Sequence, residues 1–238
     1  MRRLAAFFPI VIAFGAISLA PLAAARADGR EEGPFEIEKC QTIDKPGSYK
    51  LVNNLTFSSL TGTCLTITAS FVTIDLAGFT ISGSSFGTAI AAQRGDGRQV
   101  LHGLVVRNGS ISGIRTGVVL PEGSIVEGMR IDGSNAPAAN LDGGGIGATG
   151  IVKGNIVTSF FNGIAGGGLV TGNYVSNTAT GFSIIAGSSV IGNTATNSQS
   201  GFFVDCPSNV TDNTAVGNAV SNLVLNGTGC NNTNNVAP

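Results

Sequence analysis

A repeated Gly-Asn pair constrains this chain more than any other sequence feature. In the second half, Gly154-Asn155, Gly172-Asn173 and Gly192-Asn193 each end a four-residue block that begins with valine, and Asp212-Asn213 continues the series. The asparagines recur at intervals of 18, 20 and 20 residues, and Asn234 extends the series after a further 21. Self-similarity at this period indicates a solenoid in which each repeat is one supersecondary unit.

The repeat is too short for two packed helices, and its composition argues against helices as well. It is rich in Gly, Asn, Thr, Ser and Val, which favour turns and strands and are poor helix formers. One coil of a parallel β-helix fits such a unit, because short strands can stack ~4.8 Å from the same strand of the next coil. We therefore predict an all-β solenoid of about seven to eight coils with an N-terminal cap.

Two further stretches support this interpretation. Residues Val72 to Ile81 read Val-Thr-Ile-Asp-Leu-Ala-Gly-Phe-Thr-Ile, and Pro46 to Leu51 read Pro-Gly-Ser-Tyr-Lys-Leu. With the Gly-Asn repeats, they make residues 40 to 235 resemble the right-handed parallel β-helix of the pectin-lyase-like superfamily. The resemblance implies right-handed coils but no single activity, since such folds include lyases, hydrolases, epimerases and adhesins.

The resemblance also implies a role for the repeated asparagines. Their side chains are expected to point into a turn and to form a ladder of hydrogen bonds between coils, because an amide can both donate and accept. The residues assigned to this ladder are Asn155, Asn173, Asn193, Asn213 and Asn234.

The first residues predict export. Arg2 and Arg3 precede an apolar run from Leu4 to Leu19, and Ala25-Arg26-Ala27 resembles a cleavage site, so residues 1–27 are predicted to be a signal peptide. An uncleaved membrane anchor is the alternative, because the apolar run is almost long enough to cross a bilayer. Cleavage would leave no membrane span and a secreted or periplasmic protein.

The remaining chain is divided by composition and pattern. We predict a flexible leader at 28–39, an N-terminal cap at 40–62 and the β-helix at 63–238. Without residues 1–27 the chain has 10 basic and 14 acidic side chains, a formal charge of −4. So mild an acidity, with no polybasic patch, excludes nucleic acid as an expected partner.

The four cysteines are expected to form disulfides. Three pairings are possible in principle. The pairs Cys40–Cys64 and Cys206–Cys230 are each separated by 24 residues, about one coil, so each could bridge neighbouring coils at one end. Export favours disulfides. No metal site is predicted, because no Cys-x-x-Cys pair occurs and His102 is the single histidine.

Charged residues are concentrated in the early coils, which are longer. After Gly150 the charged side chains are Lys153, Asp205 and Asp212. Acid–base cleavage of a polysaccharide needs clustered carboxylates or a base with Ca²⁺ ligands, which these three residues do not supply. The candidate catalytic residues therefore come from the early coils: Asp75, Arg107, Arg130 and Asp132.

An alignment of the long coils gives a first estimate of their register. It places two sets of side chains in inward columns: Ile74, Leu104 and Met129, and Leu76, Val106 and Ile131. The same alignment places Arg107 and Asp132 one coil apart, within reach of an exposed ion pair that contributes roughly 0–1 kcal/mol.

Two functions from different classes remain open. The favoured one is a secreted, non-catalytic β-helix whose lateral face binds carbohydrate or a cell-envelope partner, or which serves structurally. The alternative is a polysaccharide lyase, hydrolase or epimerase with a site in the long coils at 94–142. The acidic Ca²⁺ cluster of the resembling lyases and the Gly-His-Gly segment and paired aspartates of the polygalacturonases do not occur as motifs. No cofactor is expected, except Ca²⁺ if the protein is a lyase. Ice binding is disfavoured because no Thr-x-Thr array repeats in register, and the oligomeric state is not predicted.

Overall fold

The computed structural model describes residues 33–238 except 60, 94–99 and 135–142. The predicted signal peptide at 1–27 lies outside the described residues and stays a prediction, as does the first part of the leader. The described residues form 21 strands joined by parallel pairings, and they contain no helix. No helix that could span a membrane therefore occurs in this part of the chain.

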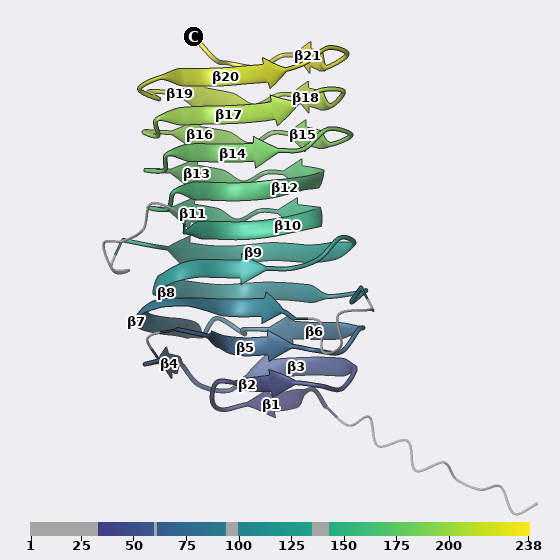
Figure 1. The fold of residues 1–238 in the computed structure, drawn as a ribbon, viewed down its shortest axis with the longest axis vertical. Helices are drawn as coiled ribbons and strands as arrows, with labels where there is room; N and C mark the ends of the chain where they lie inside the picture. Colours follow the sequence, from purple (N-terminus) through teal and green to yellow (C-terminus); the bar gives the residue numbers. More distant parts are fainter. Residues whose placement is uncertain (1–32, 60, 94–99, 135–142) are drawn as a thin grey trace, which may run out of the picture. The chain divides into compact units, whose positions relative to one another are not determined.

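The strands wind into coils with three faces, here named A, B and C, and successive coils lie one above another (Figure 1). Face C comes first in each coil and contains β2 (Gln41–Ile43), β5 (Thr63–Ile67), the end of β7 (Thr80–Ala92), the end of β8 (Val105–Val119), the start of β10 (Gly144–Lys153), the start of β12 (Asn162–Thr171), β14 (Thr180–Ile184), β17 (Ser200–Asp205) and β20 (Ser221–Asn226). Face A follows with β1 (Phe35–Ile37), β3 (Gly47–Leu51), β6 (Val72–Asp75), the start of β8, the start of β9 (Ser124–Asp132), the ends of β10 and β12, β15 (Ser189–Ile191), β18 (Asn209–Thr211) and β21 (Asn231–Thr233). Face B completes the coil with β4 (Leu55–Phe57), the start of β7, the middle of β8, the end of β9, β11 (Ile156–Thr158), β13 (Tyr174–Ser176), β16 (Thr194–Thr196) and β19 (Thr214–Val216).

This arrangement is a right-handed parallel β-helix, as the sequence predicts. The nine face C segments define nine coils, numbered here from coil 1 (β2, β3, β4) to coil 9 (β20, β21). Eight of the coils lie in residues 63–238. The segment predicted as a cap, 40–62, is itself a coil in register with the next one. Parallel pairing begins still earlier, because β1 lies inside the predicted leader and pairs with β3.

The core is a stack of apolar side chains from the three faces. One buried column on face A contains Ile74, Val106, Val126, Val152, Val170, Val190 and Val210. One on face B contains Ile81, Ile111, Ile131, Val157, Val175, Ala195 and Ala215. Burial of these side chains, at ~25 cal/mol per Å² of apolar area, supplies the main force for folding.

The register of the long coils differs from the predicted one. Ile74 lies beside Val106 rather than Leu104, and Ile131 lies beside Ile111 rather than Val106. All of these side chains are buried, so the alternation identified the inward residues correctly. Alternation says which residues point inward but not which level they occupy, and that level depends on turn lengths that the pattern does not give.

In coils 7 and 8, large side chains on one face of the core are matched by small side chains on another. Phe182 and Phe202 on face C stack with ring centroids 4.5 Å apart, in nearly parallel planes. On face B, these coils carry Ala195 and Ala215, where the preceding coil carries Val175. A dense interior has little spare volume, so a ring on one face requires a small side chain on another.

Stacked asparagines occupy the corner between faces A and B. In each step, an Oδ1 atom accepts hydrogen bonds from the backbone N–H and the Nδ2 of the asparagine one coil below, at 2.8–3.1 Å. The buried members of this ladder are Asn155, Asn173, Asn193 and Asn213. The next member is Asn235, which corrects the assignment of Asn234.

The correction has a conformational reason. The residue before each ladder asparagine has a left-handed backbone, with φ of 63–64° at Gly172 and Gly192 and 57° at Asp212. Asn234 takes this same place in the last coil, with φ of 56°, and its side chain is exposed. Asparagine is one of the few residues that tolerate this conformation, so Asn234 replaces the glycine of the repeat and Asn235 replaces its asparagine.

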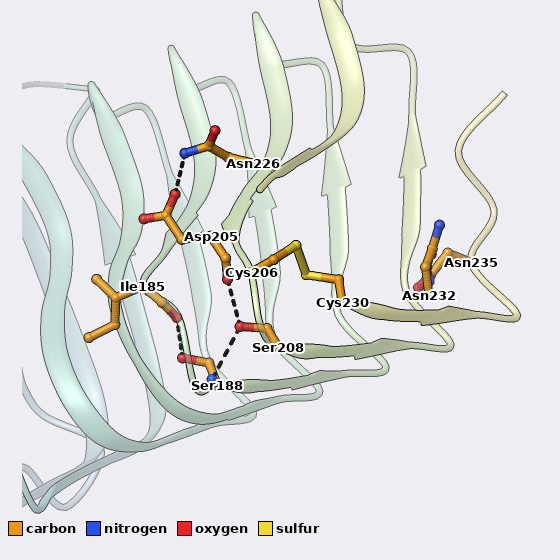
Figure 2. Close-up of a disulfide and its surroundings, with 9 residues drawn as sticks. All are labelled: Ile185, Ser188, Asp205, Cys206, Ser208, Asn226, Cys230, Asn232 and Asn235. Atoms are coloured by element: carbon orange, nitrogen blue, oxygen red, sulfur yellow. Dashed lines mark hydrogen bonds between the residues drawn. A yellow bond between two sulfur atoms is a disulfide. The ribbon is translucent and has the colours of Figure 1, made fainter. Parts of the chain in front are cut away.

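Both expected disulfides are present, one toward each end of the coil stack. Cys40–Cys64 joins coils 1 and 2, and Cys206–Cys230 joins coils 8 and 9. Figure 2 shows the second bridge beside a small serine ladder, in which the Ser188 N–H donates to Ser208 Oγ at 3.2 Å. The last coils are thus joined by covalent and side-chain links as well as by strand pairing.

Candidate functional site

A row of charged side chains runs up the outer surface of face A. Residues that are directly opposite in neighbouring coils are Glu36, Lys50, Asp75, Arg107, Glu127 and Lys153, in that order. We call these six residues the charged row. In the coils above, the same position is occupied by Thr171, Ile191, Thr211 and Thr233. The charged row is therefore confined to the early part of the helix.

One pair of neighbouring residues in the charged row forms an ion pair. Arg107 Nε donates to Asp75 Oδ2 at 3.1 Å, and Asn108 Nδ2 lies 3.3 Å from the same oxygen. The other oxygen, Asp75 Oδ1, accepts the backbone N–H of Ala77 at 2.8 Å. The Arg107 side chain is 41% exposed, so this surface ion pair contributes only about 0–1 kcal/mol. Its main effect is to orient a guanidinium whose terminal N–H groups make no hydrogen bond to the described residues.

The other neighbouring residues in the charged row do not form ion pairs with one another. Among the described residues, Asp75–Arg107 is the one ion pair within 4.0 Å. Lys50, Glu127 and Lys153 thus form no ion pair with a described residue, although a residue of opposite charge lies one coil away.

Two hollows open along the charged row. The first, of about 260 Å³, is lined by the row residues Lys50, Asp75 and Arg107 together with Pro34, Ser48, Tyr49 and Thr73. The second, of about 360 Å³, is lined by Glu127 and Lys153 with Asn108, Gly128 and Gly154 from the corner of the coil. Each hollow therefore combines a carboxylate with at least one cation.

An exposed aromatic residue lies two positions before Thr73, one of the residues that line the first hollow. Phe71 directly precedes β6, whose outward residues Thr73 and Asp75 line the hollow, and it is 69% exposed. Its φ is 57°, a strained conformation for a bulky residue. The ring lies against Gly103, where an added Cβ would be 2.7 Å from Phe71 Cδ1. Strain at an exposed aromatic side chain motivates a functional hypothesis for it.

A row of aliphatic side chains accompanies the charged row on the same face. Val105, Ile125, Ile151 and Leu169 lie directly opposite one another in coils 3 to 6. Ile151 and Leu169 are 37% and 38% exposed. Face A thus places an apolar strip two residues away from the charged row.

The four predicted candidate residues fall on two faces. Asp75 and Arg107 meet on face A, whereas Arg130 and Asp132 lie on face B at the end of β9. The expected contact between Arg107 and Asp132 is absent, because Asp132 lies opposite Ser112 and Thr158. The four residues therefore do not converge in one groove.

Asp132 has a hydrogen-bonded environment of its own. Partial burial by itself would raise the pKa of Asp132, but hydrogen bonds from Ser134, Thr158 and Ser159 outweigh burial and hold that pKa below its usual value. Thr158 Oγ1 donates to Asp132 Oδ1 at 3.0 Å, and Ser134 Oγ donates to Oδ2 at 2.7 Å. This carboxylate links two coils and acts as a structural acceptor.

No metal centre emerges from the part of the chain that the structure describes. That part holds no group of three or more His, Cys, Asp or Glu residues placed to share a metal ion. His102 is exposed, and its backbone carbonyl accepts the N–H of Phe71 at 2.7 Å. Loop residues 94–99 and 135–142, which belong to the predicted enzymatic region, lie outside the described residues.

Sequence reasoning missed most of this surface. Glu36, Lys50, Glu127 and Lys153 were not candidates, although the alternation of each strand shows that they point outward. Their common row depends on the register between coils, which the alignment misplaced. Phe71 carried no visible signal, because its exposure and its left-handed backbone are decided by the turn that contains it.

Comparisons with known proteins add little to this description. No protein-family model and no curated protein matches the chain. Among solved structures, the crystal structure of the Dettilon tailspike protein (gp208) is similar over 82% of this chain, with 14% identical residues and a TM-score of 0.36. The chain spans about half of that tailspike chain, 52% of its length. So distant a likeness assigns no function, and the candidate site stands on the geometry of face A.

Proposed function

We propose that this protein is an exported, non-catalytic β-helix that binds a carbohydrate of the cell envelope or its surroundings along face A. The observation that carries the proposal is the pair of hollows on one charged row. The fold provides a rigid, repeating surface, which suits a repeating polymer better than an isolated small molecule. Membership of the pectin-lyase-like superfamily and cleavage of residues 1–27 form part of the same proposal.

The chemistry of the surface fits sugar rings. Arg107 and Lys50 can donate hydrogen bonds to hydroxyl or carboxylate oxygens, and Asp75 can accept from hydroxyls. Phe71 offers an apolar ring face to a sugar, and the aliphatic strip offers further apolar contact along the coils. Because the Asp75–Arg107 pair already fixes the guanidinium, little side-chain freedom is lost when a ligand binds.

Binding fits the first hollow better than catalysis does. Among the described residues that line it, Asp75 is the one carboxylate, and its two oxygens already accept hydrogen bonds from Arg107, Asn108 and Ala77. Glycoside hydrolysis requires two carboxyl groups in defined positions across the bond that is cleaved. Turnover of a uronate polymer, with or without Ca²⁺, that disappears in Arg107→Ala would support the lyase alternative instead.

The test is a binding measurement with a matched control. Isothermal titration of the purified protein with a panel of neutral and charged oligosaccharides should find at least one ligand. For that ligand, Arg107→Ala should lower affinity about tenfold or more, since hydrogen bonds to a charged group contribute ~1.5–3 kcal/mol. Arg130→Ala removes the same side chain from face B of the next coil and should leave affinity unchanged. Equal losses in both variants, or no binding to any oligosaccharide, would refute face A as the site.

Phe71 permits a second test in which stability and binding change in opposite directions. Phe71→Gly removes the ring and relieves the left-handed strain, so the free energy of unfolding should stay constant or rise by about 1 kcal/mol. Affinity for the ligand should fall. A variant that binds normally would exclude Phe71 from the site, and one that melts much lower would assign the ring a structural role.

Export can be tested separately. Intact-mass measurement of the protein recovered from outside the cytoplasm should show the loss of residues 1–27. A recovered chain that keeps Arg2 and Arg3 and partitions with membranes would favour the anchor alternative.

A further inference from the structure

The signs of the charged row alternate without exception. From Glu36 to Lys153, each of the five pairs of neighbouring residues joins opposite charges. The charged row holds three cations and three carboxylates and has no net charge. The charged row therefore presents a ligand with an alternating pattern of charge rather than with a net charge.

A polymer with charges of one sign cannot match the charged row. Neighbouring coils are ~4.8 Å apart, so an anionic chain lying along the axis would meet a carboxylate between every two cations. At the spacing of neighbouring coils, the attraction by the cations and the repulsion by the carboxylates are of similar size and largely cancel. A neutral polymer avoids the repulsion but leaves the charges unused.

Mutual pairing does not account for the alternation. Unlike charges in adjacent strands stabilise a sheet when they meet. Of the five neighbouring pairs in the charged row, Asp75–Arg107 alone forms an ion pair within 4.0 Å. Glu127 and Lys153 instead border a hollow of about 360 Å³ with their charged ends unpaired. Most of the row is thus available for charges brought by a ligand.

The geometry points to a zwitterionic glycan as the ligand class: a polymer whose successive sugars carry amino and acidic groups in alternation, lying along the axis of face A. This inference rests on the proposed function and narrows it. Ammonium groups would lie against Glu36, Asp75 and Glu127, and carboxylate or phosphate groups against Lys50, Arg107 and Lys153. Six positions at the coil spacing extend over roughly 24 Å, which about six sugars can follow.

The experiment compares polymers of different charge pattern, two of which share one backbone. Hyaluronan hexasaccharide alternates a uronate with a neutral N-acetylated sugar, and its de-N-acetylated form alternates carboxylate with ammonium along the same backbone. Hexasaccharides of a polyuronate and of chitosan provide uniform negative and positive charge. Titration calorimetry at low and at physiological ionic strength should show the de-N-acetylated form binding at least tenfold more tightly than the other three, with the difference reduced by salt.

Charge reversal within the row provides the matched variants. Glu127→Lys creates three successive cations and should shift preference toward the polyuronate, and Lys153→Glu creates two successive carboxylates and should shift it toward chitosan. The double variant restores opposite charges at positions 127 and 153 but leaves Arg107 opposite a lysine, so it should recover part of the preference for the zwitterion. Arg130→Glu makes a comparable reversal on face B and should change nothing.

The outcomes separate this inference from the proposed function. Equally tight binding of hyaluronan or polyuronate that is lost in Arg107→Ala would overturn the zwitterion and leave carbohydrate binding on face A intact. Absence of binding to all four polymers and to the wider neutral panel would overturn both. Light scattering that shows a salt-sensitive dimer, broken by Glu127→Lys and restored by the double variant, would assign the row to a second copy of this chain and overturn the zwitterion.

Discussion

Coils 2 to 5 and coils 6 to 9 are built on the same three faces but differ in where they place polar groups. In the later coils the outward position of face A is Thr or Ile, and polarity is concentrated inside the corner, where Asn173, Asn193 and Asn213 are buried. In the earlier coils the charged row lies outside. Coil 5 carries both Lys153 of that row and the first buried ladder asparagine, Asn155, and in coil 4 Met129 fills the corner position instead.

The difference shows two ways of holding coils in register. A buried amide ladder must satisfy every donor and acceptor, so it fixes the level of each coil and tolerates little variation. Met129 at the same corner of coil 4 requires only volume, so this corner makes no comparable demand on the level of the coil. The ladder coils are therefore the regular part of the helix, and the charged coils are the part free to carry a ligand surface.

The largest expected effect is at the centre of the ladder. Asn193→Ala should lower the free energy of unfolding by about 2–6 kcal/mol, because the Asn173 N–H and the Val170 carbonyl lose their partners at ~1–3 kcal/mol each. Asn193→Leu should be worse, since the corner cannot hold an isobutyl group. Denaturant unfolding measures both.

The same position in the charged coils provides the contrast. Met129→Leu conserves volume and should cost less than about 1.5 kcal/mol. An Asn193→Ala variant that unfolds like the wild type would show that the ladder does not stabilise the later coils.

The two disulfides give the next largest effect and compare the two ends. Each closes a loop of 24 residues, so replacing either pair by alanine should lower stability by about 3 kcal/mol through the entropy of the unfolded chain. Melting curves of Cys40→Ala/Cys64→Ala and Cys206→Ala/Cys230→Ala test this equality. A loss confined to one variant would mean that the other end is held by its strands and side chains alone.

A smaller effect tests the last step of the ladder. Asn235→Ala should cost about 1–2 kcal/mol, because Asn213 loses the acceptor of its backbone N–H in a partly buried place. Asn234→Gly should be neutral or slightly stabilising, since glycine adopts the left-handed backbone without strain. If the two variants behaved in the opposite way, the ladder would continue through Asn234 after all.

The smallest effect concerns a link between two of the earlier coils. Asp132 in coil 4 accepts a hydrogen bond from Thr158 in coil 5, and its pKa is lower in the folded chain than in the unfolded one. Its contribution is therefore fully present above the usual aspartate pKa of about 3.9 and is lost as pH falls through the lowered value. Asp132→Ala should cost about 1 kcal/mol at neutral pH, and the difference from the wild type should shrink in acid. A difference that does not change with pH would contradict this role.

Much of the fold follows from the printed sequence. The spacing of Asn155, Asn173 and Asn193 predicts stacked coils, and the cysteine spacing suggests both disulfides among the possible pairings. The exception within the repeat is Asn234. Because asparagine can occupy either the turn position or the ladder position, the sequence does not distinguish the role of Asn234 from that of Asn235. Local pattern identifies a buried or a turning residue, but two asparagines in succession leave the choice to the backbone conformation.

The candidate site could be predicted only in part. Asp75 and Arg107 were candidates and do meet, whereas Arg130 and Asp132 lie on another face. Their separation follows from the turn at Gly128, whose left-handed backbone directs the end of β9 onto face B. The sequence by itself determined that the chain coils and which side chains face the interior, because alternation and repeat period are local properties. Only the tertiary structure decided which outward residues share a row, because that depends on turn lengths and on the register between coils that are distant in sequence.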